Sequence, residues 1–166
     1  RLQREKDSLL YETKYQYDEK NSSIRIIDKD GSETLHEYDK LGRKVSEENG
    51  LGHRTVFQYE GNKRRPEKII MPDGSVTTLC YDTRGNITKI KHGEEGALTY
   101  QYDHYNRVIE SGDGNGNCTK YSYDSRNRLI KVTRPDNAVK EYQYNGMGEA
   151  KKIIDFDRFT TQWEYN

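Results

Sequence analysis

YDSRNRLIKVTRPDNAVKEYQ, residues 123–143, is the unit from which this chain is built. Residues 129–132 are rich in β-branched side chains and are typical of a β-strand. Pro135-Asp136-Asn137 is a tight-turn signal, and residues 139–144 alternate in polarity as a second strand does. The unit therefore predicts a single β-hairpin.

The unit recurs along the whole chain, marked by Tyr-Asp or a close variant at intervals of 21 residues, with one interval of 22. A fixed period of this length indicates one small supersecondary unit in tandem. We expect residues 1–166 to form a single array, with about seven whole repeats over residues 17–164 and partial units at both ends. The pairs are Tyr17-Asp18, Tyr38-Asp39, Tyr59-Glu60, Tyr81-Asp82, Tyr102-Asp103, Tyr123-Asp124, Tyr144-Asn145 and Tyr165-Asn166.

The residues after each tyrosine predict a tight turn. An Asp next to the tyrosine can accept backbone N–H groups across the turn, and the fifth column holds residues that tolerate a positive φ. Arginine in the sixth column lies across the turn from the Asp, which predicts a ladder of balanced charges along one edge. The fifth column is Asn21, Gly42, Gly85, Asn106, Asn127 and Gly148, and the arginines are Arg43, Arg64, Arg107 and Arg128.

A second turn follows the first strand of each repeat, and its Asp-Gly and Asn-Gly pairs are strong hairpin signals. We expect these turns at Asp30-Gly31, Gly50-Leu51-Gly52, Asp73-Gly74, Gly96, Asn115-Gly116 and Asp136-Asn137. The extra residue of the 22-residue repeat is expected in the loop 61–66.

The alternation of the second strand puts aromatic residues on one face of the predicted sheet. A second column lies two residues before each repeat tyrosine and is mostly aromatic, as at Tyr100, Tyr121 and Tyr142. Aliphatic residues of the first strand, such as Ile130 and Val132, share this face. We expect an all-β fold of about fourteen to sixteen short strands in one long, curved or spiralling antiparallel sheet. Its apolar face must be covered, and its open edges favour self-association.

The composition excludes several classes of protein. The chain has 28 basic and 28 acidic side chains, so no basic surface for nucleic acid is indicated. No apolar run approaches the length of a membrane span. The sequence shows no phosphate-binding loop, nucleophile motif or zinc signature, and we expect no catalytic residue, cofactor or metal.

Two local patterns have alternative interpretations. The segment 113–117, DGNGN, resembles a calcium loop, but it lacks the Gly and Glu of that loop and lies where the other repeats turn, so a hairpin turn is favoured. Cys80 and Cys118 lie in different columns and form no CxxC pair, which favours free thiols over a disulfide.

The repeated motif resembles the YD repeat of Rhs proteins. YDKLGR, residues 38–43, is a near-complete match to its core, and YDTRGN, residues 81–86, departs only at the last position. The resemblance spans essentially the whole chain and implies a ribbon of hairpins that spirals into a hollow, non-catalytic shell. In that family, which includes Rhs toxins, the C component of Tc toxins, wall-associated proteins and teneurins, the shell encloses a C-terminal toxin or supports adhesion.

The expected function is therefore a segment of such a shell in a secreted or surface-exposed bacterial protein that takes part in toxin encapsulation. Its expected partners are further YD repeats and a toxin or other C-terminal domain of the same parent chain. The alternative is an adhesion module that binds carbohydrate or a cell-surface partner through the aromatic face. The residues expected to maintain the repeat are Tyr17, Asp18, Tyr38, Asp39, Gly42, Arg43, Tyr59, Tyr81, Asp82, Gly85, Tyr102, Asp103, Arg107, Tyr123, Asp124, Arg128, Tyr144 and Tyr165.

Overall fold

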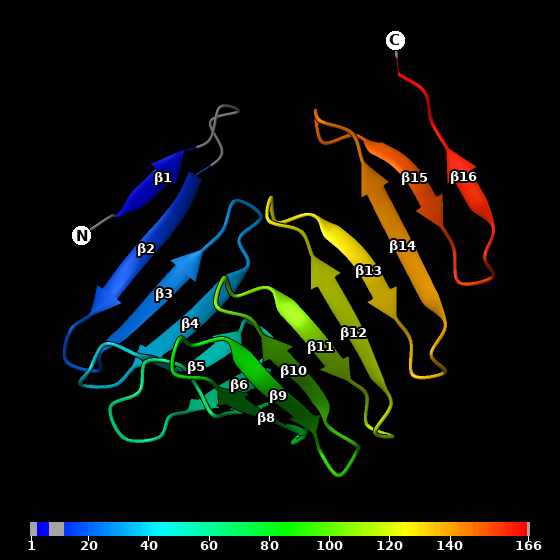
Figure 1. The fold of residues 1–166 in the computed structure, drawn as a ribbon. Coiled ribbons are helices and arrows are strands. Elements are labelled where there is room, and N and C mark those ends of the chain that lie inside the picture. The colour runs from blue at the N-terminus through cyan, green and yellow to red at the C-terminus, as the bar shows by residue number, and fades with distance from the viewer. Residues whose placement is uncertain (1–2, 7–11, 166) are drawn as a thin grey trace. The chain divides into compact units, whose positions relative to one another are not determined.

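The fold is all-β, as a computed structural model that describes residues 3–6 and 12–165 shows (Figure 1). Within these residues there is no helix, and the sixteen strands follow one another in the order of the sequence without a crossover. The chain divides into two compact units, residues 1–79 and 80–166. That all 166 residues act as a single array stays a prediction, as does the curvature of the sheet.

The strands of the first unit are β1 (Arg4–Lys6), β2 (Glu12–Asp18), β3 (Ser23–Ile27), β4 (Glu33–Tyr38), β5 (Lys44–Asn49), β6 (Arg54–Gln58) and β7 (Lys68–Ile70). The division between the units falls within β8 (Val76–Tyr81). The second unit contains β9 (Ile87–His92), β10 (Leu98–Tyr102), β11 (Val108–Gly112), β12 (Cys118–Tyr123), β13 (Leu129–Thr133), β14 (Val139–Tyr144), β15 (Ala150–Ile154) and β16 (Thr160–Gln162).

One turn geometry closes most hairpins at both of their ends. At the Asp39 turn, the Asp39 N–H donates to the Arg43 carbonyl at 2.9 Å, and the Gly42 N–H donates to the Asp39 carbonyl at 2.9 Å. Gly42 has a φ of 73°. A type I turn followed by one left-handed residue has this pattern, and it is a common three-residue hairpin loop. Asn106 and Asn127 take the left-handed position in later repeats, with φ of 62° and 64°.

The turn after each repeat tyrosine also carries a β-bulge. Ser122 pairs with Lys131, whereas Tyr123 pairs with Leu129, so Ile130 is the extra residue on β13. The same shift occurs at Tyr38, Tyr102 and Tyr144. The turns at the other end of each hairpin, such as that between Gly112 and Cys118, show no shift. A bulge bends its strand and increases the local twist. The strand ends next to the tyrosine turns therefore differ from the opposite strand ends.

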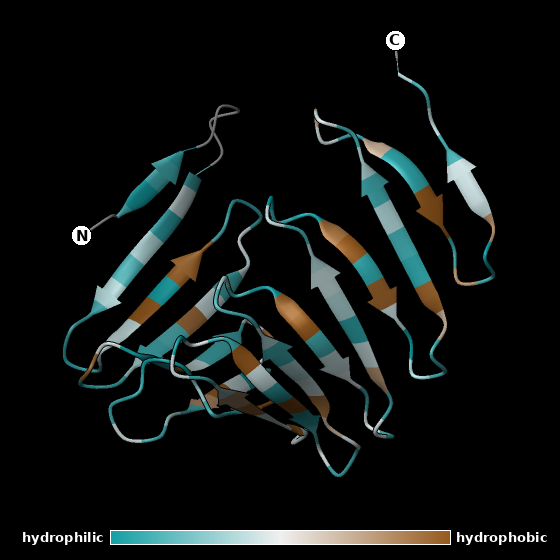
Figure 2. Ribbon diagram, in the orientation of Figure 1, coloured by the Kyte–Doolittle hydropathy of each residue, from teal (hydrophilic) through white to brown (hydrophobic). Residues whose placement is uncertain are grey.

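The register gathers apolar side chains on one face, as the alternation of the sequence predicts. Tyr121 lies opposite Val132, and Tyr142 lies opposite Ile153, so aromatic and aliphatic side chains interleave. In Figure 2 strongly hydrophobic segments lie on β3, β11, β13 and β15, whereas the Tyr-rich β12 is mostly pale and β14 is mostly teal and pale, with brown at its start.

The apolar face does not form a fully buried core within the described residues. Among the described residues no hydrophobic side chain is fully buried, and only the polar Ser46 falls to 2% exposure. The solvent-accessible surface is 12231 Å², whereas a compact protein of 19.5 kDa exposes about 8500 Å². Stability therefore comes from contacts between neighbouring strands and not from a closed core.

Three turns differ from the sequence expectation. In the first repeat Ser22, not Asn21, has the positive φ of 51°, because Tyr17 and Asp18 pair with Ile24 and Ser23 without a bulge. In the hairpin between β9 and β10 the left-handed glycine is Gly93 and not Gly96.

The third difference is Arg64, which forms no ion pair with Glu60, the acidic residue of its turn. The longer loop of its repeat, from the end of β6 at Gln58 to the start of β7 at Lys68, contains the expected insertion. There Lys63 forms the ion pair with Glu60, because the inserted residue shifts Arg64 past the turn.

Gly96 has a different role, which is the close approach of two neighbouring hairpin turns. A Cβ atom placed on Gly114 would lie 2.8 Å from the Gly96 Cα, closer than atoms pack. Gly146 has the same position within its own turn, which follows Tyr144 at the other end of a hairpin, and a Cβ placed there would meet nothing within 4 Å. The turns containing Gly96 and Gly114 are therefore in backbone contact.

We expect Gly114→Ala to lower the free energy of unfolding by about 1–3 kcal/mol, because the added methyl group forces the two turns apart. Gly146→Ala is the matched control, and its free energy of unfolding should stay within about 0.5 kcal/mol of the wild type or rise slightly. Urea unfolding followed by circular dichroism measures both. Equal effects of the two substitutions would contradict the backbone contact.

Candidate functional site

The Asp after each repeat tyrosine organises the turn that follows it, which we call the YD corner and define as the Asp or Asn and the four residues after it. The Asp124 Oδ1 atom accepts the N–H groups of Arg126 and Arg128, both at 2.9 Å. Asp39 and Asp103 accept the corresponding N–H groups at 2.8 to 3.0 Å. The carboxylate thus satisfies turn N–H groups that the strands do not pair.

The other carboxylate oxygen of the corner binds arginine. In each of three corners an arginine Nε donates to Asp Oδ2 at 2.7 Å, from Arg43, Arg107 and Arg128. The same guanidinium groups place a second nitrogen 2.5 to 2.7 Å from that oxygen. These are charge-assisted contacts on partly buried side chains, so the planar guanidinium is held in a fixed orientation.

The same arginine also contacts the next corner along the chain. Arg43 donates to the carbonyls of Gly61 and Lys63, both at 2.7 Å. Arg107 donates to the Asn127 side-chain oxygen at 3.0 Å, and Arg128 donates to the Asn145 carbonyl at 3.2 Å. Each guanidinium therefore joins two successive repeats.

The next repeat tyrosine lies against that guanidinium. The Cζ atoms of Arg43, Arg107 and Arg128 lie 4.5, 4.7 and 4.6 Å from the ring centres of Tyr59, Tyr123 and Tyr144 respectively. A cation over an aromatic face is attracted to it. The tyrosine hydroxyl donates back to a strand carbonyl of the preceding repeat. This bond joins Tyr59 to Lys44, Tyr102 to Ile87, Tyr123 to Val108, Tyr144 to Leu129 and Tyr165 to Ala150 at 2.7 to 2.9 Å.

Besides the Asp18 corner, two corners have no arginine in the sixth column. At Asp82 the partner is Asn86, which donates to Asp82 at 2.9 Å and to Asn106 at 2.8 Å. At Asn145 the partner is Glu149, which accepts from the Asn145 amide at 2.7 Å. These corners keep the turn and the tyrosine hydrogen bond but have no cation, so the charge ladder has gaps.

The corners change the pKa values of their carboxyl and phenol groups. The backbone N–H of the arginine has the largest effect and lowers the pKa values of Asp39 and Asp124; burial opposes this effect, and the guanidinium lowers the pKa values further. Burial raises the pKa values of the Tyr59, Tyr123 and Tyr144 hydroxyls. The carboxylates are therefore ionised and the phenols neutral at pH 7.

The earlier repeat residues are placed differently. Asp18 accepts from the Asn21 N–H at 3.1 Å and from its amide at 2.7 Å, in a turn without arginine. Tyr38 donates its backbone N–H to the Ser22 carbonyl and meets the His36 ring edge to face. Tyr17 and Tyr81 end β2 and β8 or lie next to their ends. Asn166 lies outside the described residues.

One polar cluster was not predicted from the sequence. Ser46 donates to Glu37 at 2.6 Å, and Glu37 also binds Arg54 from the strand on the other side. Ser46 lies between these strands, directly opposite Glu37 on one side and Val56 on the other. The signal in the sequence that could have revealed this cluster is a pair of opposite charges two strands apart, with a small Ser on the strand between them.

The remaining candidate sites have structural roles in the described residues. Asp113 accepts from the Asn115 and Asn117 backbone, each at 2.9 Å, and from the Asn117 amide at 2.8 Å, so the DGNGN segment forms a hairpin turn. Both cysteines are free thiols. The described residues contain no group of three His, Cys, Asp or Glu able to hold a metal ion, and no described helix could cross a membrane.

Comparisons with known proteins agree with this geometry. The Teneurin YD-shell family profile matches residues 5–96, more than half of the chain, and the RHS Repeat profile matches residues 81–117 and 102–139. No curated protein matches the chain.

Solved structures show the same fold. The crystal structure of TcdB2-TccC3-Cdc42 is similar at 18% identity, with a TM-score of 0.53 over 85% of this chain and 8% of that chain. The crystal structure of TcdB2-TccC3 without hypervariable C-terminal region gives 16% identity and a TM-score of 0.54, over 85% and 8% of the two chains. This chain therefore spans a small part of those proteins.

We expect Tyr144→Phe to lower the free energy of unfolding by about 1 kcal/mol, because the Leu129 carbonyl loses its hydroxyl donor while the ring stays in place. Tyr105→Phe is the control, since its exposed hydroxyl makes no hydrogen bond to the described chain. Urea unfolding of both variants provides the measurement. A loss in Tyr105→Phe as large as that in Tyr144→Phe would exclude a specific role for the corner.

We expect acid to destabilise the corners. Asp39 and Asp124 have folded-state pKa values below their unfolded-state values. Their contribution to the free energy of unfolding is therefore complete above about pH 4 and is lost as pH falls through the folded-state pKa. Asp124→Asn, which copies the natural Asn145 corner, should show a smaller loss in urea midpoint between pH 6 and pH 3 than the wild type. An identical pH dependence would show that the Asp124 carboxylate contributes nothing.

Proposed function

This chain belongs to the YD-shell family of repeat proteins, and on that premise we propose that it forms a wall segment that encloses a toxin domain of its parent protein. The role is mechanical and not catalytic. The observation that carries the proposal is the linkage of the Asp39, Asp103 and Asp124 corners to the next corner through one arginine and one tyrosine, because it joins small units into a wall.

The apolar face gives the wall an inner side. Its tyrosines and aliphatic residues are partly exposed, and no hydrophobic side chain is fully buried among the described residues. A face of this kind is stable in water only when something lies against it. We infer that in the parent protein this face is turned toward the enclosed domain and the curled wall, whereas the charged face meets solvent.

The enclosed partner is proposed to be a C-terminal domain of the same parent chain. The description of one solved relative names a hypervariable C-terminal region of TcdB2-TccC3, which supports a variable domain after the repeats in this parent as well. The parent would act outside the producing bacterium, as a secreted or surface-bound toxin in competition between cells. The wall would keep the domain from proteases and from the producer's own cytoplasm until delivery.

The coding sequence on both sides of this segment tests the architecture. Many further YD repeats, a DPxG-type end of the repeat region and a short variable C-terminal domain are expected. Cell-wall anchors after a few repeats would contradict encapsulation and favour adhesion.

Protease protection of the intact parent protein tests the mechanism. We expect the C-terminal domain to resist digestion in the wild type and to become digestible when Arg43, Arg107 and Arg128 are all changed to Gln, because three links between repeats are lost. The matched control changes the exposed Arg64, Lys151 and Arg158 to Gln, which removes the same charge outside the arginine–aspartate pairs and outside the links between repeats. Equal protection in both triple variants, or digestion of the wild-type domain, would contradict the proposal.

A further inference from the structure

The aliphatic row of the apolar face is interrupted at Ser111. In the neighbouring repeats the residue opposite the inner aromatic position is Val132, opposite Tyr121, and Ile153, opposite Tyr142. In the repeat before these two the residue opposite Tyr100 is Ser111. A short polar side chain therefore replaces a branched aliphatic one between two tyrosine-bearing strands.

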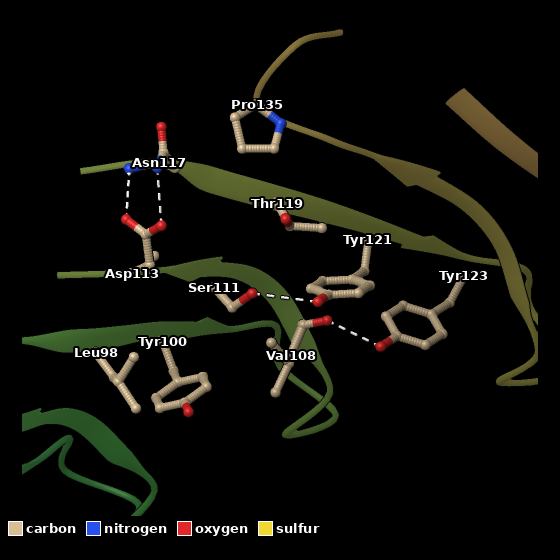
Figure 3. Close-up of a pocket in the computed structure, with 11 residues that line it drawn as sticks. Leu98, Tyr100, Val108, Ser111, Asp113, Asn117, Thr119, Tyr121, Tyr123 and Pro135 are labelled. Atoms are coloured by element: carbon tan, nitrogen blue, oxygen red, sulfur yellow. Dashed lines mark hydrogen bonds between the residues drawn. The ribbon is translucent and has the colours of Figure 1, made fainter. Parts of the chain in front are cut away.

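This replacement leaves a hollow on the apolar face of the second unit. The hollow has a volume of about 480 Å³, within the range of small-molecule sites. Its walls include Leu98, Tyr100, Val108, Thr119, Tyr121 and Pro135. Figure 3 shows Tyr121 and Tyr100 on either side of Ser111, with Pro135 and Thr119 above.

Hydroxyl groups supply most of the polar lining. The Ser111 and Tyr121 hydroxyls are 3.2 Å apart, so their one hydrogen bond leaves a second proton to donate. The Tyr100 hydroxyl makes no hydrogen bond to the described part of the chain, and Thr119 adds a further hydroxyl. These groups can both donate and accept, as a hydroxylated ligand requires.

The hollow presents no uncompensated charge. Among the described residues that line it there is no Lys, Arg or His, and Asp113 is the one acidic residue. The Asp113 carboxylate accepts three N–H bonds from its own turn, at 2.8 to 2.9 Å. An ionic ligand would find no counter-charge, and a purely apolar one would leave the hydroxyls unpaired.

We propose that this hollow binds an uncharged sugar in its pyranose form. The C–H groups of one sugar face would lie on the electron-rich face of Tyr100 or Tyr121, and the sugar hydroxyls would exchange hydrogen bonds with Ser111 and Tyr121. The wall function does not require this site, because the YD corners lie at the ends of the strands and Ser111 takes no part in them.

Binding is tested on the whole 166-residue chain with three neutral disaccharides, namely maltose, cellobiose and N,N′-diacetylchitobiose. N-acetylneuraminic acid serves as the charged comparator. We expect NMR shift changes at Tyr100, Ser111 and Tyr121 with at least one disaccharide, at a Kd of roughly millimolar order, and none with the acid. The absence of shift changes with all three disaccharides would overturn the proposal.

Ser111→Val restores the aliphatic residue of the neighbouring row and fills the hollow without removing a packing contact. It should weaken binding about tenfold or more, and Tyr121→Phe, which keeps the ring but loses the hydroxyl, should also weaken it. Ser122 lies next to Tyr121 on β12 but on the opposite face of the sheet, so Ser122→Val should bind as the wild type does. Unchanged affinity in Ser111→Val, with the variant folded by circular dichroism, would overturn the site.

Discussion

The guanidinium group shared between two YD corners is the contact on which the rest of this wall depends. Arg128 is held by Asp124 within its own turn, and from that fixed position it reaches the Asn145 carbonyl and the Tyr144 ring of the next repeat. Without Asp124 the guanidinium would have no fixed orientation. Without the next tyrosine it would lie in water and contribute little, as isolated surface ions do.

This arrangement replaces a hydrophobic core with interactions between nearest neighbours. No described hydrophobic side chain is fully buried, so each repeat gains its stability from the repeats on either side. The two kinds of link run in opposite directions, since Arg128 donates forward along the chain and Tyr144 donates back to Leu129. A repeat in the middle of the array is therefore fixed from both sides, and additional repeats can extend the wall without a change of geometry.

The sequence predicts this fold well because the structure is local and repeated. The strand positions, the apolar face and the charged ladder all follow from periodicity, since the Tyr-Asp pair or its variant recurs eight times. The exceptions arise where one repeat departs from the rule: Ser22 follows a turn without a bulge, and an insertion displaces Arg64. The Ser111 hollow needs the strand register as well as the sequence, because the period aligns Ser111 with Val132 but only the pairing places Ser111 opposite Tyr100.

The gap in the charge ladder at Asp82 has a mechanical consequence. Links that follow one another along a chain all carry the same load, and such a series yields at its softest member. The Asp82 corner is joined to the next through the neutral Asn86 and through Arg84, which reaches the Asp103 carbonyl at 3.2 Å. It has no counterpart of the cation held between Asp124 and Tyr144. A wall pulled from its ends would yield first at seams of this kind, at Asp82 and at Asn145, which gives a shell made of such ribbons defined places to open.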